Sequence, residues 1–500
     1  MDVSATNGLP LAVYTAEQVR ALDRYAIEEL RIPSYTLMTR AGEAALGTLR
    51  SCWPSAQNVL VVCGPGNNGG DGYVLARAAR EQRLTVRVVS VTDPANLRGD
   101  ARRAHDDFVA GGGTVETRGA TLPDAHVIVD AIFGTGLSRP VDAATAEVIR
   151  AINDSRAHVL ALDIPSGLHA DTGEVLGAAV VAERTVTFIA LKLGFYVGEG
   201  PDYTGIIHFD DLEVAASAAT SISPLAERIA EATLARLLPP RRRTAHKGQN
   251  GSVLVIGGGI GMAGAARMAG EAALRSGAGL VTVATRAENV AAIVAGRPEL
   301  MCRGVADGSE LQALISRADV LAVGPGLGQD EWAQTMLNVA LASHKAAVVD
   351  ADALNLLARS PRRGERWILT PHPGEAGRLL GRQTAEIQSD RIGAAREIAA
   401  RYGGIVVLKG ARTLVFTANA RPSICDRGNP GMASPGMGDV LTGVIAGIVA
   451  QTSDLAGAAR AGVLAHAMAG DLAARRGERG LIATDLFAYL PTCVNPAQQP

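Results

Sequence analysis

Short apolar runs alternate along the chain with longer stretches in which apolar residues recur every three or four positions. The short runs are rich in valine, isoleucine and leucine, as in strands buried on both faces, whereas the longer stretches have helical spacing. The first half has such runs at residues 58–63, 84–91, 126–130, 158–163 and 184–189. The second half has them at residues 252–258, 280–285, 320–326, 346–351, 367–371, 405–410 and 413–416. This alternation predicts the α/β class, with parallel sheets covered by helices on both faces.

The length and one polar stretch indicate two domains. A chain of 500 residues exceeds what a single hydrophobic core normally serves. Residues 213–226 are small and polar and have no periodic pattern, which is typical of a linker. We therefore expect one domain at residues 1–218 and a second at residues 219–490, each with three αβα layers. Residues 491–500 are rich in proline and glutamine, which predicts a disordered tail.

Composition and charge indicate which kinds of molecule the chain can bind. Apolar residues make up 47% of the chain and charged residues 20%, and the formal net charge of −2 gives no basic footprint for nucleic acid or an anionic membrane. The five cysteines lack C-x-x-C spacing, so neither a zinc site nor a disulfide framework is indicated. A signal peptide and a long apolar span are not evident. We expect a cytoplasmic homo-oligomer that binds small molecules, not nucleic acid or membrane.

Polar and glycine-rich segments follow four strands of the first domain, where ligands bind in parallel sheets. GPGNNGGDG (residues 64–72) is expected to form a loop whose N–H groups can bind phosphate and whose side-chain oxygens can bind a cation. Asp130, Asp163 and Lys192 lie at the ends of the later strands. Each segment alone is also explained by ordinary turn chemistry. Their recurrence at four strand ends favours a binding site.

The stretch GNPGMASPGMGDVLTG (residues 428–443) carries the clearest chemical signal in the second half. An apolar run with helical spacing follows its glycines, which places Asp439 in the first turn of a helix. Free N–H groups at such a terminus bind anions, and a carboxylate there can accept a proton from a hydroxyl that attacks a nucleotide's terminal phosphate. The alternative is that Asp439 only caps the helix.

Other polar residues of the second domain also follow predicted strands. Lys409 and Arg412 can place cations on a nucleotide phosphate, and Glu375 can hold a water-coordinated Mg²⁺ ion. The alternatives are that Lys409 is a surface lysine and His372 a turn histidine.

NNGGDG, DAIFGTGL and DIPSG together resemble the N-terminal domain of the YjeF family, the NAD(P)H-hydrate epimerases, over about residues 10–215. The resemblance implies a Rossmann-like fold and a potassium ion near Asn68, Asp130 and Ser166. It also implies that Asp163 is the acid/base group and Lys192 its charge partner, although Asp163 could cap a turn and Lys192 could be solvated. The residues implied in binding the hydrate are Asn67, Asn68, Gly69, Gly70, Asp71, Gly134, Thr135, Gly136, Leu137, Ser138, Arg139, Pro140 and Asp163.

HPGE, VLKG and GMGDVLTG resemble the ribokinase-like superfamily and, more narrowly, the NAD(P)H-hydrate dehydratase domain of the same family, over about residues 228–490. KGQNGSVLVIGG, AALRSGAGLVTVAT and VGPGLG support this resemblance. It implies that an adenine nucleotide contacts Lys409, Gly410, Ala411, Arg412 and Gly438. It implies that the hydrate contacts Ala265, Gly326, His372 and Asp439.

The two resemblances together imply metabolite repair. The first domain would epimerise the R and S hydrates of NADH and NADPH. The second would dehydrate the S epimer by phosphorylating its ring hydroxyl, with Asp439 as the base and Mg²⁺ as a cofactor. The bacterial two-domain members use ADP, and the residues leave ATP open.

Two other functions are compatible with parts of the pattern. One is a ribokinase-like small-molecule kinase fused to a dinucleotide-binding regulatory module, which would release a stable phosphorylated product. His372 weighs against it, because sugar kinases of the superfamily usually have asparagine there. The other is a first domain that acts only as a scaffold, which the presence of Asn68, Asp130, Asp163 and Ser166 opposes.

Overall fold

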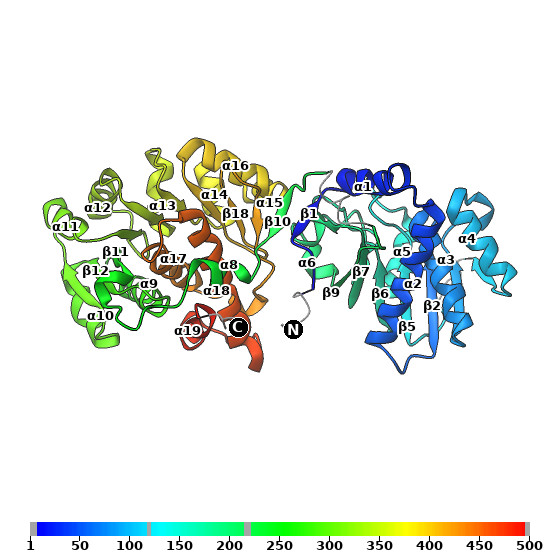
Figure 1. Ribbon diagram of the computed structural model, residues 1–500. Coiled ribbons are helices and arrows are strands. Elements are labelled where there is room, and N and C mark those ends of the chain that lie inside the picture. Colours follow the sequence, from blue (N-terminus) through cyan, green and yellow to red (C-terminus); the bar gives the residue numbers. More distant parts are fainter. Residues whose placement is uncertain (1–7, 118–121, 215–221, 496–500) are drawn as a thin grey trace. The chain divides into compact units, whose positions relative to one another are not determined.

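The computed structural model describes residues 8–117, 122–214 and 222–495 (Figure 1). It divides the chain into two compact units, residues 2–226 and 227–500. The expected boundary between residues 218 and 219 lies outside the described residues, as does the end of the expected tail. In the part of the chain that is described, no helix is both long and apolar enough to cross a bilayer.

The first unit contains a parallel sheet of strand order β4-β3-β2-β5-β6-β7-β9. Val61 of the central strand β2 pairs with Val88 of β3 and Val129 of β5. The strands are β2 Asn58–Cys63, β3 Thr85–Ser90, β4 Val115–Thr117, β5 Val127–Ala131, β6 His158–Leu162, β7 Arg184–Phe188 and β9 Ile206–Asp210. The five predicted strands are confirmed. The edge strands β4 and β9 were missed because they are only partly buried and lack a continuous apolar run. A short parallel pair outside this seven-stranded sheet joins β1 Ala12–Tyr14 to β8 Leu191–Lys192.

Helices cover both faces of this sheet. Along β2, Val59 and Val61 pack into a core with α1 to α4, while Leu60 and Val62 pack into a core with α5. The helices are α1 Ala16–Glu28, α2 Ser34–Cys52, α3 Asn67–Glu81, α4 Gly99–Ala110, α5 Ala143–Asn153 and α6 Gly200–Tyr203, with 3-10 turns η2 Pro94–Asn96 and η3 Leu193–Phe195. One prediction is wrong: residues 67–72 are the start of α3 and not a loop. Their glycines allow close packing, since a Cβ at Gly70 would collide with Met38 of α2.

The second unit has a sheet of order β13-β12-β11-β14-β15-β16-β17-β18-β19-β10. Pairing is parallel except at β17–β18 and β18–β19. The strands are β10 Ala226–Arg228, β11 Ser252–Ile256, β12 Leu280–Thr285, β13 Met301–Gly304, β14 Val320–Val323, β15 Ala346–Val349, β16 Trp367–Leu369, β17 Ile405–Leu408, β18 Leu414–Phe416 and β19 Ser423–Ile424. The seven predicted strands are confirmed, and the short strands β10, β13 and β19 were missed.

This sheet is also covered on both faces. Val320 and Ala322 of β14 share a core with α9, α17 and α18, and the alternate residues Leu321 and Val323 are buried as well. The helices are α8 Ala232–Leu237, α9 Ala263–Arg275, α10 Val290–Gly296, α11 Gly308–Ile315, α12 Glu331–Ala342, α13 Ala351–Arg359, α14 Pro373–Leu380, α15 Thr384–Ser389, α16 Arg391–Tyr402, α17 Met437–Val449, α18 Leu455–Ala473 and α19 Leu490–Cys493. The 3-10 turns are η4 Lys247–Asn250, η5 Ala287–Asn289, η6 Pro430–Met432, η7 Ala474–Arg476 and η8 Ala483–Ala488. Both units therefore have the three layers expected of the α/β class.

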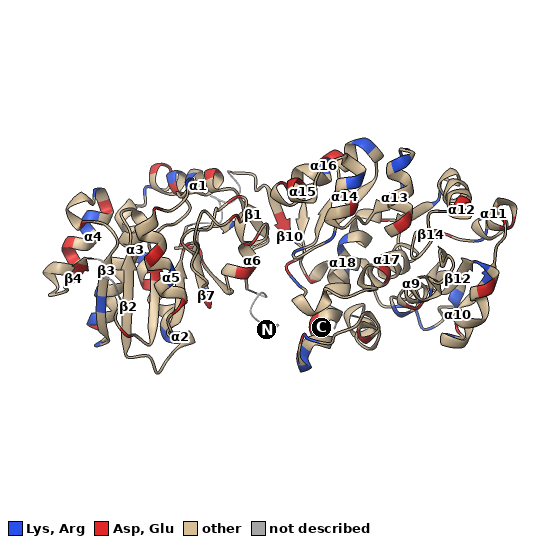
Figure 2. Cartoon of the chain, turned by 180° about the vertical axis from the view of Figure 1, so that it is seen from behind, with Lys and Arg blue, Asp and Glu red and all other residues tan. Residues whose placement is uncertain are grey.

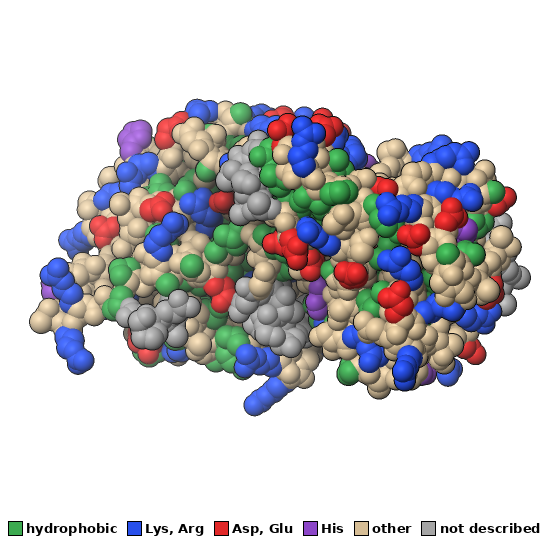
Figure 3. Space-filling view, turned by 45° about the vertical axis from the view of Figure 1, so that its right-hand side comes forward, with side chains coloured by type: hydrophobic (Ala, Val, Ile, Leu, Met, Phe, Trp, Pro, Cys, Tyr) green, Lys and Arg blue, Asp and Glu red, His purple; other side chains and the backbone are tan. Residues whose placement is uncertain are grey.

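The end of the second unit differs from the expected tail. Helix α19 packs on α18, and Cys493 and Val494 are buried. Apolar contacts thus order the chain beyond residue 490, and residues 496–500 lie outside the described part. Figure 2 shows acidic and basic residues interspersed over the helices of both units, and Figure 3 shows the same mixture on one face. This mixture agrees with the net charge of −2.

Candidate active sites

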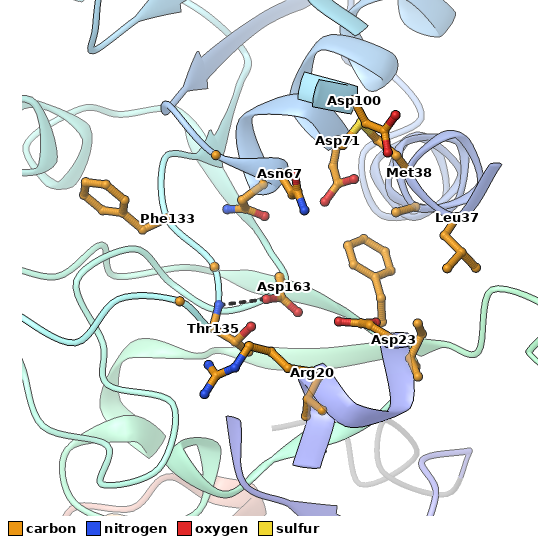
Figure 4. A pocket seen from close by; sticks show the side chains of 18 of the residues that line it. Arg20, Asp23, Leu37, Met38, Asn67, Asp71, Asp100, Phe133, Thr135 and Asp163 are labelled. Carbon is orange, nitrogen blue, oxygen red and sulfur yellow. Dashed lines mark hydrogen bonds between the residues drawn. The ribbon is translucent and has the colours of Figure 1, made fainter. Parts of the chain in front are cut away.

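A cavity of about 560 Å³ lies at the carboxyl ends of the central strands of the first unit (Figure 4). Its wall includes apolar residues of α1 and α2, the start of α3, and the segments that follow β5, β6 and β7. Most residues predicted to bind the hydrate line it: Asn67, Asn68, Asp71, Gly134, Thr135, Gly136, Leu137, Ser138, Arg139 and Asp163. Among the described residues, Gly69, Gly70 and Pro140 were also predicted to bind the hydrate but do not line the cavity. A Cβ on Gly69 would collide with the Gly64 carbonyl, which gives this glycine a packing role.

Asp163 is held between two hydrogen-bond donors at the cavity wall. Its Oδ2 accepts a hydrogen bond of 3.0 Å from the backbone N–H of Thr135, and its Oδ1 is ion-paired with Nζ of Lys192. Lys192 is fully buried, and its ammonium also donates to Thr187 Oγ1 at 2.6 Å and to the Phe188 carbonyl at 3.1 Å. The solvated-lysine alternative is therefore wrong. Asp163 has a φ of 64°, a left-handed conformation that aspartate adopts more readily than most residues.

Three further carboxyl groups line the same cavity, among them Asp100 of α4. Asp71, on α3, was predicted to belong to this site, whereas Asp23, on α1, was not predicted. Burial, followed by repulsion from Asp163, raises the pKa of Asp23 to about 6. Burial and the charges of Asp163 and Asp23 raise the pKa of Asp71 well above its usual range. Asp23 interrupts the apolar stripe of α1 between Val19 and Ile27, and this was the available sequence signal.

The residues predicted to bind potassium lie beside this cavity. Asp130 is buried, and its carboxylate accepts from Ser166 N–H at 2.8 Å, Ser166 Oγ at 2.6 Å and Ile132 N–H at 3.2 Å. Burial raises the pKa of Asp130 to about 6. Asn68 is 7% exposed, and both polar atoms of its side chain are buried without a hydrogen-bond partner in the described structure. An unpaired buried amide is costly, so its oxygen is available to a cation. All three side chains carry oxygen atoms, the donors that hard cations prefer.

In the second unit, the start of α17 forms the centre of the other site. Gly436 precedes the helix with a φ of 88°, which favours glycine, and Asp439 lies in the first turn as predicted. Within the described residues no side-chain hydrogen bond caps α17, which weighs against the capping alternative for Asp439. Burial, followed by repulsion from Asp350, raises the pKa of Asp439 to about 7.

Lys409 reaches this helix terminus from the end of β17. Its Nζ lies 2.6 Å from Oδ1 of Asp350 and 3.6 Å from Oε2 of Glu375, and its side chain is 17% exposed. Although burial alone would lower the pKa of Lys409, the charges of Asp350 and Glu375 raise it. A Cβ on Gly438 would lie 3.2 Å from Nζ, so the ammonium lies directly over the first turn. The surface-lysine alternative is wrong.

Asp350 is the main residue of this site that the sequence did not reveal. It is 1% exposed, and its Oδ2 accepts a hydrogen bond of 2.8 Å from Thr442 Oγ1 on α17. Asp350 thus connects the end of β15 to both α17 and Lys409. It was overlooked because the predicted strand extended to residue 351, whereas β15 ends at Val349.

His372 and Glu375 form the N-terminal cap of α14. His372 Nδ1 accepts from Gly374 N–H at 3.0 Å, and Glu375 Oε2 accepts from His372 N–H at 2.7 Å. The turn role of His372 is therefore confirmed, although half of its side chain is exposed. Glu375 is engaged in the cap and with Lys409, so its carboxylate is less free for a metal ion than predicted.

The remaining predicted residues fall into two groups. A Cβ on Gly326 would lie 3.0 Å from the Cβ of Ala265, so these two are neighbours. Gly410 and Ala411 are exposed, beside Lys409 in the chain. The guanidinium of Arg412 donates to the Asp426 carbonyl.

Comparison with known proteins covers both units. Residues 34–194 match the family of YjeF-related protein N-termini, and residues 253–492 match the NAD(P)H-hydrate dehydratase family. The bifunctional NAD(P)H-hydrate repair enzyme Nnr of Coxiella burnetii is 49% identical over 486 residues, covering 97% of this chain and 99% of that one. The chain belongs to the bifunctional NAD(P)H-hydrate repair enzymes. The Nnr enzyme of Escherichia coli K12 is 45% identical, covering 98% of this chain and 95% of its own.

A solved structure agrees with the fold of the dehydratase half of this repair enzyme. A ribokinase-like superfamily protein from Enterococcus faecalis is 32% identical with a TM-score of 0.50, covering 54% of this chain and 95% of that one. The ADP/ATP-dependent NAD(P)H-hydrate dehydratase of Bacillus subtilis, co-crystallised with ATP/Mg²⁺, is 31% identical with a TM-score of 0.49, covering 54% and 97%. The family match over both halves favours repair over a kinase fused to a regulatory module.

Proposed function

We propose that the cavity of the first unit is the epimerase site and that the start of α17 is the dehydratase site of this repair enzyme. The observation that carries the second assignment is the position of Lys409 over the turn that contains Asp439. The ion pair of Asp163 with the buried Lys192 at the cavity wall supports the first.

In the dehydratase site, Asp439 accepts the proton of the ring hydroxyl as its oxygen attacks the terminal phosphate of the nucleotide. A pKa of about 7 suits a general base that works near neutral pH. The N–H groups of Gly436 to Gly438 and the ammonium of Lys409 balance the charge on the phosphoryl group. The lone pair of the ring nitrogen then expels phosphate, which yields NADH or NADPH. Ala265, Gly326 and His372 would hold the hydrate.

The nucleotide is an adenine nucleotide, and we propose ADP, held by Lys409, Gly410, Ala411, Arg412 and Gly438. Mg²⁺ would enter with the nucleotide and neutralise phosphate charge. Such an ion needs only one or two protein carboxylates beside phosphates and waters. Glu375 is the nearest candidate, through a water molecule.

In the epimerase site, the hydrated ring loses its hydroxyl and regains one on the opposite face. Asp163 is the acid/base group, and Lys192 keeps a positive charge against it. Asn68, Asp130 and Ser166 would hold a potassium ion, which adds positive charge beside the segment that follows β5. The unpartnered amide of Asn68 supports this site.

We also propose that the enzyme acts in the reducing cytoplasm as a homo-oligomer. The five cysteines are free, which suits a reducing compartment. Light scattering of the purified chain tests the assembly.

The deciding experiment supplies the purified chain with both epimers of hydrated NADH, Mg²⁺, K⁺ and either ADP or ATP, and follows the absorbance of reduced nicotinamide. We expect more reduced nicotinamide to be recovered than the fraction of the substrate that one epimer makes up, and we expect ADP to support faster recovery than ATP. A stable phosphorylated product without reduced nicotinamide would instead indicate the kinase alternative. The absence of recovery with either nucleotide, from folded protein, would refute the repair function.

A further inference from the structure

An epimerase that removes and returns a hydroxyl must act on both faces of the ring. The hydroxyl leaves more readily when it is protonated, and the water that replaces it adds more readily when it loses a proton. One side chain at one wall of the site reaches only one face of the ring, and the two steps take place on opposite faces. A second acid/base group, entering the cavity from another wall, is therefore expected beside Asp163.

The cavity contains such a group on α1. Asp163 directly follows β6, whereas Asp23 lies on α1, near the start of the domain. Figure 4 shows the two carboxyl groups turned toward the same space, with Asp71 above them. Val19 and Ile27, one turn to either side of Asp23, also line the cavity, so this face of α1 borders the substrate.

The hydrogen bonds distinguish the two carboxyl groups. Asp163 receives donors on both oxygens, from Thr135 and from the ammonium of Lys192. In the described structure no hydrogen bond or ion pair is formed by Asp23 with any protein group. A partly buried carboxyl without donors favours its protonated form.

We propose that Asp23 is the second catalytic residue of the epimerase, the proton donor that works opposite the Asp163 carboxylate. This inference rests on the proposed epimerase function of the cavity. It assigns the two residues different roles in each direction of the reaction.

The chemical step is balanced with water alone. The Asp23 carboxyl gives its proton to the ring hydroxyl, the carbon–oxygen bond breaks, and the ring nitrogen shares its lone pair to form a carbon–nitrogen double bond. Water is released. A second water then adds to the same carbon from the other face, its proton passes to Asp163, and the electron pair returns to nitrogen. The reverse reaction exchanges the two roles, and solvent resets the protons between turnovers.

The charges around Asp23 agree with this role. Burial and then Asp163 raise its pKa to about 6, while Lys192, Arg24 and Arg20 oppose the shift. Asp71, from α3, adds a further carboxyl to the same space. A bound hydrate would displace water from the cavity and raise the pKa further.

The test uses the full-length chain and the purified R hydrate of NADH, without nucleotide, so that only epimerisation is followed by chromatography. Asp23→Asn is expected to lower the epimerisation rate about 100-fold, the usual contribution of one acid/base group. Glu28→Gln is the matched control, because it removes an exposed carboxylate from the same helix. It should epimerise within about twofold of the wild type. Asp23→Glu, which restores the carboxyl, should recover part of the loss.

Two measurements keep the inference testable if Asp23→Asn is poorly folded. In ¹⁸O-labelled water, each inversion by the wild type should introduce one solvent oxygen into the hydrate. The rate of epimerisation by the wild type should also fall as the pH rises above the pKa of Asp23, the proton donor. Inversion with retention of the original oxygen, or a wild-type rate in folded Asp23→Asn, would overturn the inference. A wild type that does not epimerise would overturn the proposed function itself, which the wild-type control distinguishes.

Discussion

The ammonium nitrogen of Lys409 lies 2.6 Å from Oδ1 of Asp350, and the other oxygen of Asp350 accepts a hydrogen bond from Thr442 at 2.8 Å. One buried carboxylate therefore fixes both the cation and the helix that meet at the dehydratase site. Asp350 also raises the pKa of Asp439 by its charge.

We predict that Asp350→Asn impairs dehydration and shifts its pH profile. The change leaves a buried ammonium without its closest anion, which should destabilise the domain by about 3 kcal/mol. It also removes negative charge near Asp439, so the acidic limb of the rate profile should move to lower pH. Thr442→Val is the control, because it removes only the hydrogen bond, costs about 1 kcal/mol and should leave the limb in place. An unshifted limb in Asp350→Asn would contradict the assigned coupling.

We predict that the dehydration rate of the wild type falls below about pH 7. The base must be ionised to accept a proton, and burial raises the pKa of Asp439 to about 7. The rate should therefore drop about tenfold for each pH unit below that value. Asp439→Asn should lower the rate by about 100-fold or more and abolish the limb. If the limb persists in Asp439→Asn, another group is the base.

Gly438→Ala is expected to disturb Lys409 without disturbing the helix. The added Cβ would lie 3.2 Å from the ammonium nitrogen, so the nitrogen must shift by a few tenths of an ångström and its position over the first turn is disturbed. We expect kcat/KM for the nucleotide to fall about tenfold, which corresponds to about 1.4 kcal/mol of lost phosphate stabilisation. Gly47→Ala, where the new Cβ meets nothing within 4 Å, controls for the effect of alanine in a helix. Unchanged nucleotide kinetics would show that Lys409 does not contact phosphate.

Lys192→Met should disable the epimerase and leave dehydration of the S hydrate unchanged. The substitution leaves Asp163, Thr187 Oγ1 and the Phe188 carbonyl without their shared donor. Each lost donor to a buried acceptor costs about 1–3 kcal/mol, so chemical denaturation should also report a weaker first domain. Retention of epimerisation by Lys192→Met would remove Lys192 from the mechanism.

Potassium should stabilise the wild-type chain but not Asn68→Ala. Because the Asn68 amide has no hydrogen-bond partner among the described residues, its loss should cost little stability in sodium buffer, whereas a bound ion raises the melting temperature with its concentration. The measurement is thermal unfolding of both proteins at increasing KCl, with NaCl at equal ionic strength. Equal responses of the two proteins to potassium would argue against this site.

From the sequence we could predict the layers of the fold and the reactive residues that follow the strands. The residues that approach these sites from other parts of the chain were not predicted. Asp163 was predictable because it directly follows a strand of a parallel sheet, and Asp439 because it lies between a glycine-rich segment and an apolar run with helical spacing. Asp23 and Asp350 were not, because one lies within a helical stripe and the other follows an apolar run without a glycine-rich loop. Their roles arise from contacts across the fold, which local patterns do not contain. NNGGDG was read as a loop because its glycines outweighed the helix-forming residues that follow.

Helix α17 has its apolar residues buried on all sides and lies between α9 and α18. A Cβ on Gly443 would collide with the Ala269 carbonyl of α9, so the helices meet closely. An element enclosed in this way cannot detach by local fraying, and its central amides should exchange with deuterium only when the whole domain opens. Because Asp439 is carried on that helix, heat inactivation of the dehydratase and cooperative melting of its domain should be a single event.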